Sequence, residues 1–144
     1  MKPPVLLLVL SLVAIFVALQ AYIRLAPVDA ARWDVDPFAA PDPGEGGDKC
    51  LIDTAMTPQE ALGRLAQVAQ ATARTRLVAG SVEAGRMTYM TRSKLWGFPD
   101  FTTIEARAVP TGAQVAILAR LRFGKSDLDV NATRVATWRA AAGL

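Results

Sequence analysis

The sequence contains no histidine and only one cysteine, Cys50. Without histidine the chain lacks the usual general base near neutral pH, the common catalytic triads and most kinds of zinc site. A lone cysteine forms no intrachain disulfide, and Cys50 lies too far beyond the apolar N-terminal segment to be a lipoprotein's attachment residue. We therefore expect no metal site, no cofactor and no enzymatic activity.

Charged side chains are also absent from residues 4–23, which read PVLLLVLSLVAIFVALQAYI. About 20 apolar residues rising 1.5 Å each match a hydrocarbon core of roughly 30 Å. We predict an N-terminal tail over residues 1–3 and a transmembrane helix over residues 4–24. The alternative is a secretory signal peptide with Lys2 as its charged start and Ala30 closing a Val-Asp-Ala cleavage site. Because the apolar region of a signal peptide is usually about 7–15 residues long, we favour the anchor.

The orientation of the span follows only weakly from its flanks. Lys2 precedes it and Arg24 and Arg32 follow it, so the positive-inside rule gives little preference. An anchor at the start of a chain most often leaves the N-terminus in the cytoplasm. We expect a single-pass protein of the bacterial inner membrane with its C-terminal domain in the periplasm.

Charge is distributed unevenly in the rest of the chain. Residues 25–54 carry seven acidic and two basic residues (2 − 7 = −5), whereas residues 55–144 carry six acidic and twelve basic residues (12 − 6 = +6). We predict an acidic, Pro- and Gly-rich linker over residues 25–56 and a basic domain over residues 57–144. Trp33 and Phe38 are costly to leave in water, so we expect them to dock on the domain or at the headgroup layer.

Regular structure begins at Thr57-Pro58-Gln59-Glu60. Thr57 is a candidate N-cap, and Glu60 completes a capping-box pattern that starts a helix over about residues 58–73. Four strands with turn residues between them follow, and a last helix is expected near the C-terminus. The predicted strands are 76–82, 86–96, 101–109 and 113–123, and the predicted last helix is 131–142.

The order of these elements predicts an α+β fold with a four-stranded, mainly antiparallel meander between two helices. A sheet of this size needs an apolar layer, so we expect both helices on one sheet face. Turn and cap chemistry is expected at Gly97, Pro99, Gly124, Ser126, Asp127 and Asn131.

The stretch ARLRFGKS, residues 119–126, fits a relaxed phosphate-binding loop. Such a loop needs backbone N–H groups that curl round a phosphate and lead directly into a helix. Here Arg-Leu-Arg-Phe continues the alternation of a strand, and Asp127 and Asp129 would repel a phosphate. We interpret the match as a strand end and expect no nucleotide.

Cationic side chains recur at alternate positions of two strands. If these positions share one sheet face, three interpretations remain: a surface for anionic lipid headgroups, polyanions or an acidic partner, a solvated face, or a face neutralised by the acidic linker. Nucleic acid is not expected, since exposed aromatic residues do not interleave with the cations. The residues are Arg86, Arg92 and Lys94 on strand 86–96, Arg120 and Arg122 on strand 113–123, and Lys125 beyond it.

The segments RLAPVDAARWDVDP, YMTRSKLWGFPDFTTIEA and LARLRFGKSDLDVNATRVATW resemble the bacterial family known as domain of unknown function 1499. Members usually have His where this chain has Asp34, Gly where it has Asp129, and a basic residue where it has Ala132. If that Gly serves a left-handed turn, Asp129 can replace it, because Asp tolerates positive φ. The resemblance implies a fold and an envelope location, and it implies no biochemical activity.

Three functional hypotheses follow. The favoured one is a membrane-anchored, non-catalytic module that binds an anionic ligand, a lipid headgroup or a protein partner. The second is an accessory subunit of an inner-membrane protein complex. The third is a hydrolase-like enzyme that uses Asp100 and Asp127, whose turns would meet at one end of the sheet. In each case the lipid bilayer is a partner.

Overall fold

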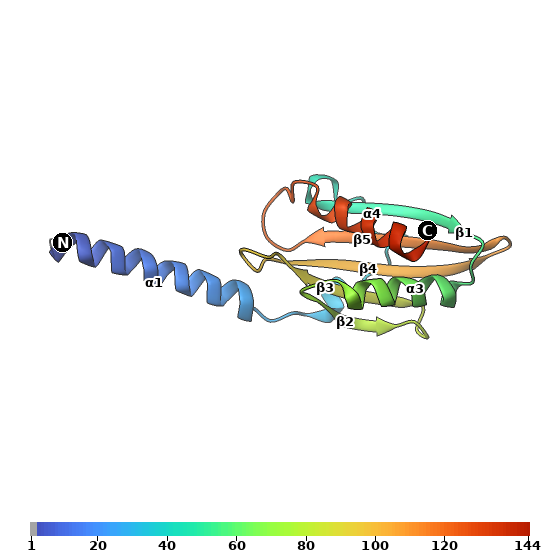
Figure 1. Ribbon diagram of the computed structural model, residues 1–144, viewed down its shortest axis with the longest axis horizontal. Helices are drawn as coiled ribbons and strands as arrows, with labels where there is room; N and C mark the ends of the chain where they lie inside the picture. Colours follow the sequence, from blue (N-terminus) through green and yellow to red (C-terminus); the bar gives the residue numbers. More distant parts are fainter. Residues whose placement is uncertain (1–2) are drawn as a thin grey trace.

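A computed structural model describes residues 3–144, and it shows a long helix projecting from one end of a sheet-based domain (Figure 1). Two residues of the predicted tail, 1 and 2, lie outside the described residues, and the third begins helix α1 (Pro3–Leu25). The mean hydropathy of α1 reaches 2.6 in an 18-residue window. It is therefore long and apolar enough to be a membrane span or a signal sequence.

The sheet of the domain has five strands, one more than the sequence predicts. Every neighbouring pair is antiparallel, in the spatial order β1-β5-β4-β3-β2. The last four strands form the expected meander, and the first lies at the sheet edge beside β5. The strands are β1 (Gly47–Thr54), β2 (Thr75–Ser81), β3 (Arg86–Arg92), β4 (Pro99–Val109) and β5 (Gly112–Leu121).

The additional strand, β1, comes from the segment predicted to be linker. The glycines before and at the start of β1 are typical of a flexible linker. In the structure, however, Gly47 pairs with Arg120, and the two backbones come close together there. A Cβ at Gly47 would lie 2.0 Å from the carbonyl oxygen of Ala119, so only glycine fits there. The sheet consequently begins ten residues earlier than the predicted domain start of 57, after a short 3-10 turn, η1 (Gly44–Gly46).

Helices α3 (Pro58–Ala71) and α4 (Val130–Ala142) cover one face of the sheet, as predicted. The Thr57 hydroxyl caps α3 by accepting from the Glu60 amide at 3.2 Å, while the Glu60 carboxylate pairs with Arg64. Between helices and sheet lies the main core, where the Tyr89 and Trp138 rings meet edge to face, 6.0 Å apart. Apolar positions at helical and alternate-strand spacing therefore meet in one layer.

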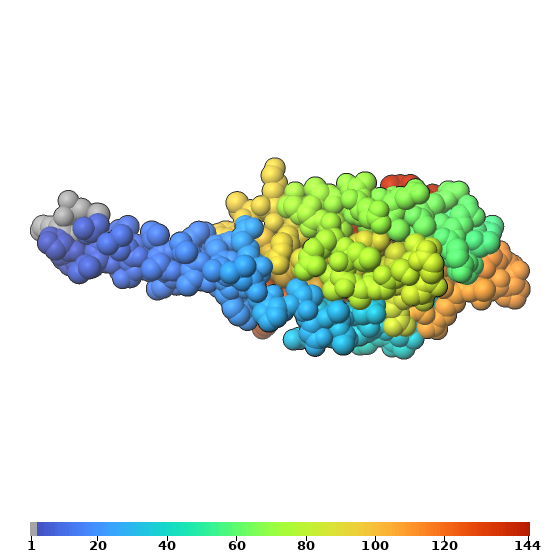
Figure 2. Space-filling view, turned by 90° about the horizontal axis from the view of Figure 1, so that it is seen from below, coloured from blue at the N-terminus to red at the C-terminus, as the bar shows by residue number. Residues whose placement is uncertain are grey.

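The opposite face of the sheet is covered by the segment that follows α1. Its short helix α2 (Ala30–Trp33) ends in Trp33, which is 7% exposed and stacks on Phe101 with ring centroids 4.0 Å apart. Figure 2 shows this segment lying against the body of the domain beyond the end of α1. The acidic linker is thus a third layer over the central strands.

The turns explain where two strands end earlier than predicted. β3 stops at Arg92 because residues 93–98 form a closed turn, in which the Ser93 amide donates to the Phe98 carbonyl at 2.9 Å. Gly97 has φ +74° within that turn, and Pro99 is the first residue of β4. β5 stops at Leu121, before Gly124 at φ +98°.

The start of α4 differs from the predicted cap. Asn131 lies inside the first turn, fully buried, and its Oδ1 accepts from Arg134 at 2.6 Å. The Asp127 carboxylate accepts from the Asn131 amide at 2.9 Å, and the Ser126 hydroxyl accepts from the Leu128 amide. Asp129 has φ +62°, a left-handed conformation that Asp adopts more readily than most residues other than Gly.

Candidate functional site

The predicted basic residues of β3 and β5 share one sheet face, but most of that face is not open. The Arg86 Nε donates to Glu105 Oε2 at 2.6 Å, and the Arg120 Nη2 donates to the Trp33 carbonyl at 2.6 Å. Groups of the acidic linker and of β4 therefore already bind two of the cations, Arg120 and Arg86, that were predicted to form an open basic surface.

Arg120 is the residue that holds the linker to the sheet. Its guanidinium carbon lies 5.1 Å from the centroid of the Trp33 ring, and the Thr103 hydroxyl donates to the same Trp33 carbonyl at 2.9 Å. Burial lowers the pKa of the Arg120 guanidinium below its ordinary value. A side chain in this position serves the packing of Trp33 and is not free to bind a ligand.

Phe38 is the other predicted docking residue. Its ring centroid lies 4.1 Å from the guanidinium carbon of Arg107, so it docks on the domain.

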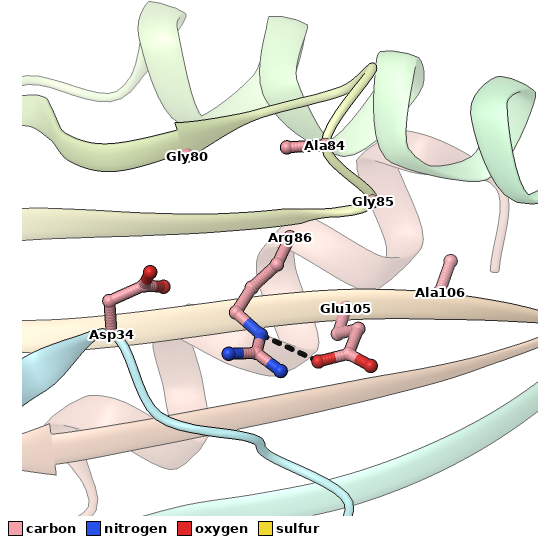
Figure 3. Close-up of a pocket in the computed structure, with 7 residues that line it drawn as sticks. All are labelled: Asp34, Gly80, Ala84, Gly85, Arg86, Glu105 and Ala106. Atoms are coloured by element: carbon pink, nitrogen blue, oxygen red, sulfur yellow. Dashed lines mark hydrogen bonds and ion pairs between the residues drawn. The ribbon is translucent and has the colours of Figure 1, made fainter.

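Arg86 lines an open pocket of about 450 Å³ at the turn between β2 and β3 (Figure 3). Glu105 binds Arg86 through one carboxylate oxygen and Arg107 through the other, and Asp34 accepts from the Thr88 hydroxyl at 2.8 Å. Two carboxylates and one guanidinium line this pocket, so it has no excess positive charge with which to attract an anion. Its lining residues are Asp34, Gly80, Ala84, Gly85, Arg86, Glu105 and Ala106.

A second pocket, of about 390 Å³, lies where α1 meets the sheet, and we call it the cationic pocket. Five of its lining residues are basic and none is acidic. Two of them, Arg92 and Lys94, belong to the predicted basic surface. The other three come from the end of α1 (Arg24), the turn before β2 (Arg74) and β2 itself (Arg76). The lining residues are Arg24, Arg74, Thr75, Arg76, Met90, Arg92, Ser93 and Lys94.

Arg92 joins α1 to the sheet at the floor of this pocket. Its Nη1 donates to the Ile23 carbonyl at 3.2 Å and to the Gly97 carbonyl at 2.8 Å, and its Nη2 donates to the Arg24 carbonyl at 3.1 Å. The last carbonyls of a helix have no partner within the helix, so Arg92 caps the C-terminus of α1. This contact fixes the position of α1 against the domain.

The electrostatics of the cationic pocket favour an anion. Burial, followed by the neighbouring guanidiniums of Arg76, Arg24 and Arg122, lowers the pKa of Arg92 below its ordinary value. Over residues 3–144, none of the pocket's basic residues forms an ion pair with a carboxylate. No carboxylate therefore offsets the mutual repulsion of these cations.

Arg74 occupies an uncommon backbone conformation at the pocket rim. Its φ is +58°, in the left-handed region that costs a non-glycine residue on the order of 1–3 kcal/mol. Its Nε donates to the Arg92 carbonyl at 3.1 Å. The fold therefore holds a strained cation beside the other pocket residues.

The other two predicted basic residues lie outside the cationic pocket. The Arg122 guanidinium carbon is 5.3 Å from the Phe123 ring centroid, and Lys125 is exposed in the loop after β5. That loop is not a phosphate cradle: Ala119 is paired within β5 on both sides, and the next helix begins only at Val130.

The two carboxylates considered for catalysis are engaged at the start of α4. Asp100 Oδ2 accepts from Arg134 Nη2 at 3.3 Å, and both oxygens of Asp127 accept backbone amides. Burial raises the pKa of Asp100, with Arg134 acting in the opposite direction. Within residues 3–144 no group of three His, Cys, Asp or Glu side chains is arranged to hold a metal ion.

Comparison with known proteins gives one strong match. A family model described as "Protein of unknown function (DUF1499)" matches residues 31–141. No curated protein matches the chain. Among solved structures, protein MLL2253 from Mesorhizobium loti is similar at a TM-score of 0.48 and 7% identity, covering 65% of this chain and 91% of that one, which is too weak a likeness to carry an argument.

Proposed function

The chain belongs to the DUF1499 family, which has no assigned activity, and from the geometry we propose that it is a single-pass, membrane-anchored binding module of the bacterial envelope. In this proposal α1 spans the inner membrane, the domain lies in the periplasm, and the cationic pocket binds an anionic ligand without catalysis. The observation that carries the proposal is the set of five basic side chains around one cavity with no carboxylate among them.

The chemistry of the pocket suits a phosphate or carboxylate group. Guanidinium groups present planar, paired N–H donors that match the oxygens of such anions, and lysine adds a mobile point charge. Arg74 and Arg92 already donate to backbone carbonyls. This leaves Arg24, Arg76 and Lys94 as the main donors for a ligand. Each hydrogen bond to a charged group contributes about 1.5–3 kcal/mol, so two or three of them give selective binding.

An uncleaved α1 is part of this proposal, and three contacts support it. Ile23 is only 3% exposed, and Arg92 depends on α1 for two of its acceptors. The candidate signal-cleavage residue, Ala30, begins α2, and the Asp29 side chain caps that helix by accepting from the Ala31 amide. A protease that needs an extended chain would meet a capped helix at this point.

The proposal is tested by titrating the full chain, in a neutral detergent at low salt, with inorganic phosphate and with pyrophosphate. We expect saturable binding that weakens as salt is raised, because added ions screen the pocket. The double variant Arg76→Gln with Lys94→Gln should bind at least about tenfold more weakly.

The matched control is Arg64→Gln. Arg64 lies on α3 beside Gly143 and pairs with Glu60, away from the pocket. The substitution therefore removes a guanidinium charge without touching the pocket. Binding should be unchanged in this variant. If neither anion binds the wild-type chain, or if Arg64→Gln and the pocket double variant weaken binding equally, the proposed function is wrong.

A further inference from the structure

Large apolar side chains are exposed on the end of the domain that faces α1. Leu95 is 75% exposed, Trp96 is 45% exposed and Leu128 is 86% exposed. They come from the β3–β4 and β5–α4 loops, which both lie at the end of the sheet that α1 joins (Figure 1). A single exposed leucine is ordinary, but three large apolar residues on two neighbouring loop tips indicate a contact surface.

The contacts of these loops with α1 fix their depth along the helix. The Trp96 ring lies 6.2 Å from the ring of Phe16, and the Phe123 ring lies 6.1 Å from that of Tyr22. Phe16 precedes the end of α1 by nine residues, which at 1.5 Å per residue is about 13 Å. If α1 spans a bilayer, Trp96 therefore reaches beside the helix to the level of the acyl chains.

The charges behind the loop tips match the headgroup layer. Lys94 directly precedes Leu95, and Arg24 lies at the end of α1 with its guanidinium against Gly97. Cations that stand just outside an apolar contact surface lie where lipid phosphates lie, and aromatic residues favour the same boundary. The apolar tips and the cationic pocket thus form one surface with the layering of a lipid leaflet.

The backbone at the second loop tip supports a contact role. Leu128 has φ +52°, which is uncommon for a residue with a branched side chain, and it is followed by Asp129, also at positive φ. This pair of left-handed residues turns the chain sharply where the loop enters α4. A strained backbone conformation of this kind persists only where the surrounding structure enforces it, and such conformations are concentrated at functional sites.

We infer that the α1-facing end of the domain is a lipid-binding surface, in which Leu95, Trp96 and Leu128 enter the leaflet and the cationic pocket binds the phosphate of an anionic phospholipid headgroup. The inference rests on the proposed function, since it names the source of the pocket's anion. If α1 spans a bilayer, Trp96 beside its middle lies where lipid can reach it and a soluble partner cannot, which favours lipid over a second protein.

The depth of Trp96 is tested with the full chain in phosphatidylglycerol bilayers whose acyl chains carry bromine, which quenches tryptophan fluorescence on contact. Trp33 and Trp138 are 7% and 1% exposed, so we expect Trp96 to supply most of the quenchable signal. Trp96→Phe should remove that part of the quenching. If Trp96→Phe leaves bromine quenching unchanged, Trp96 is not in the leaflet and the inference is wrong.

The source of the phosphate is tested by titrating the full chain in neutral detergent with dihexanoyl phosphatidylglycerol, dihexanoyl phosphatidylcholine and inorganic phosphate. We expect the anionic lipid to bind more tightly than either of the others. Arg76→Gln with Lys94→Gln should weaken both the anionic lipid and the free phosphate, by about fivefold for each charge removed. Leu95→Ser with Leu128→Ser should weaken only the lipid, by at least about tenfold.

The two titrations separate the inference from the proposed function. If phosphate binds but the anionic lipid binds no more tightly, or if the leucine double variant leaves lipid binding unchanged, the lipid surface is wrong while the anion pocket stands. If neither phosphate nor the anionic lipid binds, both are wrong.

Discussion

Replacing Trp33 by alanine should separate the linker from the sheet and destabilise the whole domain. Trp33 is 7% exposed, stacks on Phe101 at 4.0 Å and lies against Met90 in a small core on the face opposite the helices. The guanidinium of Arg120 packs over its ring. Truncation removes the apolar contact that holds the linker and leaves the half-buried guanidinium of Arg120 beside a cavity.

The magnitude follows from the size of the side chain and its burial. A buried Trp→Ala change costs about 3–5 kcal/mol, including the cavity that remains. The free energy of unfolding of a domain of this size is typically about 5–15 kcal/mol, so the loss is a large part of the total. Trp33→Phe keeps an aromatic ring over Phe101 and should cost roughly half as much.

The assay is urea denaturation of the full chain in neutral detergent, followed by near-ultraviolet circular dichroism, which reports the packed aromatic residues of the domain and not the helicity of α1. With a slope of roughly 1.5 kcal/mol per molar urea, Trp33→Ala should lower the midpoint by about 2–3 M. Trp96→Ala is the control, because Trp96 is 45% exposed, and it should change the free energy of unfolding by about 1 kcal/mol or less.

The reasoning is refuted if the two alanine variants unfold at the same urea concentration. That result would mean that the docked linker contributes nothing to the stability of the sheet. It would also mean that the environment of Arg120 does not depend on Trp33.

Three further predictions concern other parts of the domain. Burial raises the pKa of Asp100, so on acidification the folded state binds a proton at this carboxylate before the unfolded state does. The wild type should therefore gain stability relative to Asp100→Asn as the pH falls from about 7 to about 4. Urea denaturation at the two pH values checks the sign of this difference. Gly80→Ala and Gly85→Ala place alanine at nearly the same positive φ, but only at Gly80 would the Cβ meet backbone, 2.1 Å from the Arg86 carbonyl oxygen. Thermal melts should therefore show a cost of about 1 kcal/mol for Gly85→Ala and a clearly larger one for Gly80→Ala, and equal costs would contradict the clash. Burial also raises the pKa of the Cys50 thiol, so iodoacetamide should modify it more slowly at about pH 8 than it modifies free cysteine, and equally fast reaction would show that the thiol is open.

Local patterns predicted most of the fold. The alternation along β3 and β5 and the Thr57 cap each depend on neighbouring residues, so the α+β order and the placement of both helices on one face could be read from the sequence. The first strand could not. β1 pairs only with β5, whose paired residues lie 59 to 73 positions further along the chain (113 − 54 and 120 − 47), and its composition resembles that of a linker. Edge strands have weak patterns because neither face is fully buried.

The candidate site was predicted in part, and for a related reason. Strand parity puts Arg86 and Arg92 on one face of β3 and leaves open whether Arg120 of β5 shares that face. The register of the sheet shows that it does, but parity carries no information on what covers the face. The linker buries Arg120, and Glu105 from the next strand neutralises Arg86. The cationic pocket depends on the meeting of three distant segments, which only tertiary structure brings together.

The capping of α1 by Arg92 has a consequence for how this protein tolerates change. Arg92 recognises the carbonyl oxygens of Ile23 and Arg24, and every amino acid supplies such an oxygen. The side chains at the end of α1 can therefore change without loss of these two hydrogen bonds, provided that the helix still ends at the same place. Position 92, by contrast, has no substitute with the same reach and paired donors, so this contact tolerates change at the end of α1 but not at Arg92.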